Sequence, residues 1–148
     1  MQCRSFAFQV QLPEVGLGTW KYAGGTGPLR HAVELGATLI DTAESYDTEE
    51  IVGQAIQGIR HKALLATKIS PCDFRRRDVK TAAEASLRRL KTDYIDLYQL
   101  HWPNLIVPLE ETMSAMEELA DEGKIRLIGV SKFPGRRTAS RTGCSFPS

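Results

Sequence analysis

Short apolar runs rich in β-branched and aromatic residues alternate with segments of helical periodicity along most of this 148-residue chain. This alternation predicts strand–helix units that build a parallel sheet covered by helices. The runs are apolar on both faces, as strands of a helix-covered sheet require. They recur about every 23 to 32 residues, and the five predicted strands span residues 15–20, 38–43, 63–69, 94–101 and 126–133.

Helix start and stop signals separate the predicted strands. Proline is favoured in the first helical turn, a hydroxyl residue at the N-cap, and glycine just past the end. The starts and stops predicted in this way are Pro28 and Gly36, Thr48, Asp78, and Pro108 and Gly123. The last helix is expected to turn one apolar side toward the sheet, made of Leu109, Met113, Met116, Leu119 and Ala120.

Composition places the chain among globular domains. Apolar residues make up 42% and charged residues 25%, and no apolar run reaches the roughly 20 residues of a membrane span. The three cysteines are far apart, and cysteine and histidine show no metal-ligand spacing, which favours reduced thiols, a cytoplasmic protein and no metal. Alternating Phe6, Phe8, Val10 and Leu12 predict a further strand near the N-terminus.

Charge divides the chain into two parts. The net charge is +1, but residues 134–148 contain three arginines and no acid, which leaves −2 for the rest. A slightly acidic body gives no electrostatic reason to expect a nucleic-acid partner. Residues 134–148 also lack helical or strand periodicity. We therefore expect an α/β domain over 1–133 and an irregular basic tail, disordered or out of frame, over 134–148.

Four ionisable residues lie at or just beyond the ends of three successive predicted strands. Asp41, Tyr46, Lys68 and His101 hold these positions. The carboxyl ends of parallel strands meet at one edge of the sheet, which is where ligands bind in α/β folds. The sequence therefore predicts that the four side chains share one site. A doubly wound open sheet and a (β/α)8 barrel both remain compatible with this pattern.

The four residue types suit one kind of chemistry. A tyrosine of ordinary pKa, about 10, is a reluctant acid at neutral pH, and a nearby ammonium lowers that pKa. Lys68 is expected to act on Tyr46 in this way, with Asp41 balancing the lysine charge. Protonation of a carbonyl oxygen as hydride reaches the carbon fits this set. Because no side chain can give a hydride, a nicotinamide cofactor is expected to supply it.

Five segments together resemble the aldo-keto reductase family. They are VGLGTW (15–20), IDTAESY (40–46), ATK (66–68), DLYQLHWP (96–103) and IGVSKF (128–133). The resemblance implies the N-terminal portion of a (β/α)8 TIM barrel, with about five βα units, incomplete and not closed. It also implies reduction of an aldehyde or ketone, a small-molecule substrate, with NADPH, or alternatively NADH, as cofactor.

The resemblance also assigns roles to single residues. It implies Tyr46 as the general acid, Lys68 and Asp41 as the pair that tunes it, and His101 as the residue that orients the carbonyl. It implies contact with the cofactor by Thr19, Trp20, Asp41 and Ser131. Trp20 and Trp102 are implied to line the substrate pocket.

One position departs from the family pattern. Lys132 stands where the family usually has asparagine, and an ammonium cannot accept a hydrogen bond. The resemblance also ends with the fifth strand, whereas a complete barrel takes about 250 residues. The alternative to an active reductase is therefore a catalytically inactive, truncated or frameshifted family member without the cofactor phosphate site. Open sheet edges would then favour self-association.

Overall fold

The computed structural model describes residues 3–5 and 11–133, in which strands and helices alternate as the sequence predicts. The strands of the main sheet are β3 (Leu17–Gly18), β4 (Leu39–Asp41), β5 (Leu64–Ile69), β6 (Ile95–Leu100) and β7 (Ile125–Val130). The helices between them are α1 (Thr26–Glu34), α2 (Glu49–Ile56), α3 (Arg76–Leu90) and α4 (Leu109–Asp121). The short 3-10 helices are η2 (Glu44–Tyr46), η3 (Arg60–Lys62) and η4 (Pro71–Asp73). None of the helices in these ranges has the length and apolar character that crossing a membrane takes.

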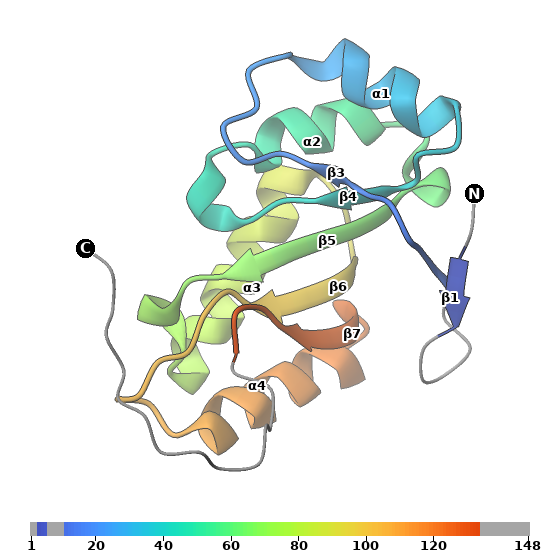
Figure 1. Cartoon of the computed structure of the whole chain (residues 1–148). Helices are drawn as coiled ribbons and strands as arrows, with labels where there is room; N and C mark the ends of the chain where they lie inside the picture. Colours follow the sequence, from blue (N-terminus) through green and yellow to red (C-terminus); the bar gives the residue numbers. More distant parts are fainter. Residues whose placement is uncertain (1–2, 6–10, 134–148) are drawn as a thin grey trace, which may run out of the picture.

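The five strands form one parallel sheet in the order β3-β4-β5-β6-β7. The register aligns Asp41 of β4 with Ala66 of β5, and Lys68 of β5 with Gln99 of β6. The helices cover one face of this curved sheet (Figure 1), whereas a doubly wound fold would have helices on both faces. Within the described residues β3 and β7 are edges, so the sheet is an unclosed part of an α/β barrel, as predicted.

Helix ends follow the predicted signals with small shifts. α1 begins before Pro28, which lies in its first turn, where an absent amide hydrogen costs no intrahelical bond. α3 begins before Asp78, whose carboxylate lies near the positive end of the helix dipole. Gly36 and Gly123 end their helices with φ of 101° and 73°, a left-handed region open to glycine.

Two predictions about local structure are wrong. β3 and β4 are shorter than residues 15–20 and 38–43, because inter-strand pairing covers only part of each apolar run. Leu109, predicted on the buried side of α4, is 44% exposed. It is the first residue of the helix, whereas Met116 and Leu119, further along the helix, are buried.

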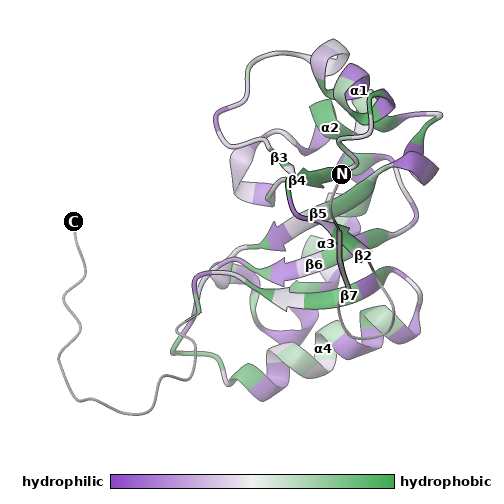
Figure 2. Ribbon diagram, turned by 45° about the vertical axis from the view of Figure 1, so that its right-hand side comes forward, coloured by the Kyte–Doolittle hydropathy of each residue, from purple (hydrophilic) through white to green (hydrophobic). Residues whose placement is uncertain are grey.

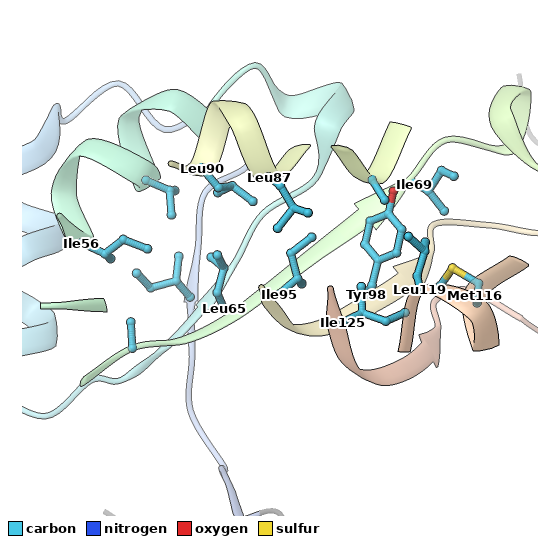
Figure 3. Close-up of a cluster of buried hydrophobic side chains, with 14 of the residues drawn as sticks. Ile56, Leu65, Ile69, Leu87, Leu90, Ile95, Tyr98, Met116, Leu119 and Ile125 are labelled. Atoms are coloured by element: carbon cyan, nitrogen blue, oxygen red, sulfur yellow. The ribbon is translucent and has the colours of Figure 1, made fainter. Parts of the chain in front are cut away.

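The core lies between the sheet and its helices. Side chains of the sheet and of the helices form one buried layer, in which Leu65 lies toward Ile56 of α2 and Tyr98 lies toward Met116 and Leu119 of α4 (Figure 3). Hydropathy follows the same division, with apolar residues on the strands and polar residues on the outer helix surfaces (Figure 2). Each fully buried large side chain of this kind stabilises the fold by about 1.5–3 kcal/mol.

The N-terminus forms a separate hairpin. β1 (Cys3–Ser5) and β2 (Gln11–Pro13) pair antiparallel, and β1 lies near the N-terminal ends of the main strands (Figure 1). The strand predicted from Phe6 to Leu12 falls largely on residues 6–10, outside the described residues. The predicted tail, 134–148, also lies outside them.

A charged cluster joins the N-terminal ends of β5, β6 and β7. Asp96 accepts hydrogen bonds from Arg60 at 2.7 Å and from Arg126 at 2.9 Å, and also from the amide of Leu65 at 2.9 Å. The two guanidinium groups lie 4.0 and 3.9 Å from the ring centroid of Tyr94. Charge-assisted hydrogen bonds and cation–π contacts therefore stabilise this edge of the sheet.

Candidate active site

The residues predicted to share a site lie at the opposite, C-terminal edge of the sheet. The strand pairing continues past the strand ends through four backbone hydrogen bonds of 2.8–3.1 Å, and these fix where each loop leaves the sheet. The amides that donate them and the carbonyls that accept them are Thr19 to Asp41, Thr42 to Ala66, His101 to Ile69, and Ser131 to Leu100.

Lys68 and Asp41 form an ion pair on neighbouring strands. The Lys68 Nζ lies 2.7 Å from both carboxylate oxygens of Asp41 and 2.8 Å from the carbonyl oxygen of Thr42. The lysine side chain is buried, whereas that of Asp41 is 38% exposed. These three acceptors satisfy all the ammonium donors. The pair is therefore a fixed, internally balanced charge at the strand edge.

Tyr46 and His101 meet across two loops. The Tyr46 hydroxyl lies 3.4 Å from His101 Nε2, and the Ser45 hydroxyl lies 3.5 Å from Nδ1 of the same ring. The two aromatic rings are edge-to-face, with centroids 5.5 Å apart. Lys68 Nζ lies 5.1 Å from the Tyr46 ring centroid. The four predicted side chains thus come together in one cluster.

The pKa of Tyr46 is raised above its ordinary value of 10.0, mainly by burial and also by the Asp41 carboxylate. The lowering expected from Lys68 is not found here. The Lys68 ammonium does not bond the phenol oxygen, because Asp41 and Thr42 accept all of its hydrogen bonds. Tyr46 therefore keeps its proton at neutral pH.

The pKa of His101 is lowered from 6.5 to about 4, mainly by burial, and further by the positive charges of Lys68 and Lys132. A histidine with this pKa is neutral at physiological pH. Its ring then has one donor and one acceptor nitrogen. If the Ser45 hydroxyl donates to Nδ1, Nε2 carries the hydrogen and faces Tyr46.

Two tryptophans flank the cluster. Trp20, after β3, is 67% exposed, and Trp102, after β6, is 39% exposed. The Trp102 ring lies with its centroid 4.0 Å from that of His101. Trp102 is therefore in direct contact with the cluster. The Lys21 Nζ lies 4.7 Å from the centroid of the Trp20 ring.

Three buried threonines connect the loops beneath the site. The Thr48 hydroxyl lies 2.9 Å from that of Thr19 and 3.0 Å from that of Thr42. Thr48 is the residue before α2, as predicted, but its side chain does not cap the helix. Tertiary contacts prevent the capping, because the hydroxyl instead bonds the two threonines at the strand ends.

Sequence reasoning singled out neither Ser45, which contacts His101, nor Glu44, which precedes it in η2. Glu44 accepts a short hydrogen bond from the amide of Ser70, and burial raises the pKa of its carboxyl group. Both residues lie between Asp41 and Tyr46 in the sequence. Their hydrogen-bond partners, His101 and Ser70, are distant in the sequence and could not be predicted from it. Among the described residues, no group of three His, Cys, Asp or Glu side chains is arranged to hold a metal ion.

A family model and individual relatives both relate this chain to the aldo/keto reductases. Residues 14–141 match the model of the Aldo/keto reductase family, a stretch that runs past the predicted domain boundary at 133. Methylglyoxal reductase YeaE of Escherichia coli is 47% identical, and the match covers 86% of this chain and 48% of that protein. Aldo-keto reductase YhdN of Bacillus subtilis is 45% identical, over 84% of this chain and 44% of its own. The chain spans about half the length of these curated relatives.

Solved structures agree with the sequence matches. The thermostable aldo-keto reductase Tm1743, in complex with the inhibitor epalrestat, superposes with a TM-score of 0.83 at 40% identity, over 90% of this chain and 54% of its own. An aldo/keto reductase from Klebsiella pneumoniae, in complex with NADP and acetate, gives 0.81 at 44% identity, over 89% and 50%. The sheet and helices described above therefore correspond to about half of such a protein.

Proposed function

The chain belongs to the aldo/keto reductase family, and from this premise we propose that it reduces the carbonyl group of an aldehyde or ketone with a nicotinamide cofactor. The observation that carries the proposal is the contact between the Tyr46 hydroxyl and His101 Nε2 at 3.4 Å. A proton donor and a neutral hydrogen-bond donor that face one another can both reach the same carbonyl oxygen.

The donor set at this edge fits the nicotinamide end of such a cofactor. The Ser131 hydroxyl forms no hydrogen bond with the described part of the chain, and a hydroxyl can both donate to and accept from a carboxamide. Trp20 offers an exposed aromatic surface, and Thr19 and Asp41 fix the adjoining strand ends. The cofactor, when bound, supplies a hydride to the carbonyl carbon. We propose NADPH in preference to NADH, because NADP is bound in the related Klebsiella pneumoniae reductase described above.

The residues of this chain handle the proton. Tyr46 holds its proton at neutral pH and gives it to the carbonyl oxygen as negative charge develops there. Neutral His101 donates from Nε2 to the same oxygen and orients it toward Tyr46. The Lys68 ammonium lies 5.1 Å from the centroid of the tyrosine ring. Asp41 and Thr42 hold the ammonium there.

The test is replacement of the proton donor. Tyr46→Phe removes only the hydroxyl, so the rate of reduction of a simple aldehyde should fall by about 10²–10⁴. NADPH binding, followed by quenching of tryptophan fluorescence, should stay unchanged. Tyr94→Phe is the matched control, because this ring lies between Arg60 and Arg126 at the other edge of the sheet.

The alternative is a family member that does not turn over. It predicts no NADPH-dependent reduction by the folded wild-type chain, whether or not NADPH quenches the fluorescence. A Tyr46→Phe variant that reduces the aldehyde at the wild-type rate would instead show that the acid is assigned to the wrong residue.

A further inference from the structure

Lys132 brings a second positive charge to the site. It follows Ser131 at the end of β7, and its Nζ lies 5.5 Å from the centroid of the Trp102 ring. Trp102 in turn contacts His101, with ring centroids 4.0 Å apart. A continuous row of contacts therefore leads from Tyr46 through His101 and Trp102 to this ammonium group.

The charge of Lys132 is not balanced within the described residues. No carboxylate there lies within ion-pairing distance of its Nζ, whereas Asp41 neutralises Lys68. The charges that act most strongly on His101 are those of Lys68, Lys132 and Asp41, two positive and one negative. With His101 itself neutral, the cluster keeps one excess positive charge. Lys132 carries this excess charge, beside the Trp102 ring.

The backbone conformation of Lys132 also supports a role in binding a ligand. Its φ is 57°, a left-handed conformation that is unfavourable for a lysine and easier for asparagine or glycine. Residues held in such conformations occur more often at ligand sites. The ammonium lies near the face of the Trp102 ring, 5.5 Å from its centroid. A cation–π contact limits the mobility of the long side chain without neutralising it.

We propose that Lys132 is a specificity residue that binds the carboxylate of an anionic carbonyl substrate, such as a short oxo acid or semialdehyde acid. This inference rests on the proposed carbonyl reduction. The carbonyl group meets Tyr46 and His101, and the carboxylate reaches past Trp102 to the ammonium. A phosphate of the cofactor is the other anion that a lysine here would attract. The contact with Trp102, a predicted substrate residue, favours the substrate.

The test measures binding, so it does not depend on turnover. Quenching of tryptophan fluorescence is titrated with 4-oxobutanoate and with butanal, which share a four-carbon chain and differ in charge. Lys132→Asn removes the charge and suits the left-handed backbone, and Lys132→Arg keeps the charge. Lys91→Asn is the matched control, because Lys91 has a φ of 52° at the end of α3.

The wild-type chain should prefer 4-oxobutanoate. Lys132→Asn should lower that preference about tenfold or more, as expected for loss of one charge-assisted contact, and Lys132→Arg should largely restore it. Lys91→Asn should leave it unchanged. The proposal is overturned if the wild-type chain shows no preference, if Lys132→Asn keeps it, or if Lys132→Asn weakens NADPH binding alone.

The outcome is separable from that of the proposed function. A charge preference that depends on Lys132 in a chain without carbonyl reduction would support the anion site and contradict the reductase activity. Reduction that requires Tyr46 but is indifferent to substrate charge would do the reverse.

Discussion

At the residue scale, two basic side chains in the same site have opposite surroundings. Lys68 reaches three oxygen acceptors, two from Asp41 and one from Thr42. His101 is buried beside two positive charges, and no carboxylate accepts a hydrogen bond from its ring within the described residues. Burial of a charge is favourable only with a partner. The site therefore pairs a fixed cation with a neutral imidazole.

This contrast predicts how stability depends on pH. Because the pKa of folded His101 is about 4 and the unfolded value is about 6.5, the unfolded chain binds more protons between these limits. The free energy of unfolding should be highest above pH 6.5 and fall toward pH 4, with His101 contributing at most about 3 kcal/mol. Urea unfolding at a series of pH values measures this slope.

The slope due to His101 is found by comparison with His101→Gln, which should flatten it. His31→Gln is the control, since His31 is exposed on α1. Equal slopes for all three proteins over pH 4 to 6.5 would contradict a lowered pKa.

At the element scale, α2 and α3 are held unusually close. A Cβ atom at Gly53 would lie 2.6 Å from the backbone carbonyl of Leu90, at the end of α3. Beside this contact, buried Glu49 accepts hydrogen bonds from Thr67 at 2.6 Å and from Arg89 at 2.7 Å. The carboxylate thus joins α2 to β5 and α3. Since the loop of Tyr46 leads directly into α2, this packing also fixes the position of the proposed acid.

Gly53→Ala should therefore destabilise the fold. The added methyl group must push the two helix backbones apart, at a cost of about 1–3 kcal/mol. Gly18→Ala is the control, because Gly18 lies in β3 where a Cβ meets nothing within 4 Å. There alanine should stabilise by about 0.5–1 kcal/mol, since glycine loses more backbone freedom on folding. Urea midpoints measure both effects, and a shift of the same sign in both would refute the close-contact explanation.

At the scale of the whole molecule, the face of the sheet without helices is accessible among the described residues. A groove of about 410 Å³ runs over it, lined by Gly16, Gly18, Leu39, Asp41, Ala66, Leu97 and Gln99. The strands β3 and β7 leave hydrogen-bonding groups unpaired along both sheet edges in the described ranges. Such edges pair readily with other strands.

We predict that this 148-residue chain associates with itself as its concentration rises. Leu127→Lys puts a charge on the half-buried face of β7 and should shift the equilibrium toward the monomer. Leu105→Lys is the control, because Leu105 is 95% exposed in the loop after β6. Sedimentation velocity over a wide concentration range measures both. If Leu105→Lys alone reduces association, the loop and not the sheet is responsible.

The sequence by itself determined the order of strands and helices and the edge at which the chemistry lies. Periodicity and glycine stops depend on local interactions, and the carboxyl ends of parallel strands share one edge. The sequence alone therefore predicts that one site contains Asp41, Tyr46, Lys68 and His101. The segments of the aldo-keto reductase pattern strengthened that choice.

Only the tertiary structure decided which atoms meet and what electrostatic environment each has. Lys68 bonds Asp41 instead of Tyr46, and burial raises the pKa of the tyrosine where the sequence suggested lowering. The Thr48 hydroxyl bonds Thr19 and Thr42 instead of its helix. The Lys132 ammonium lies near the Trp102 ring, beyond the paired ends of β6 and β7. These outcomes depend on burial and on contacts between distant segments, and local sequence patterns specify neither.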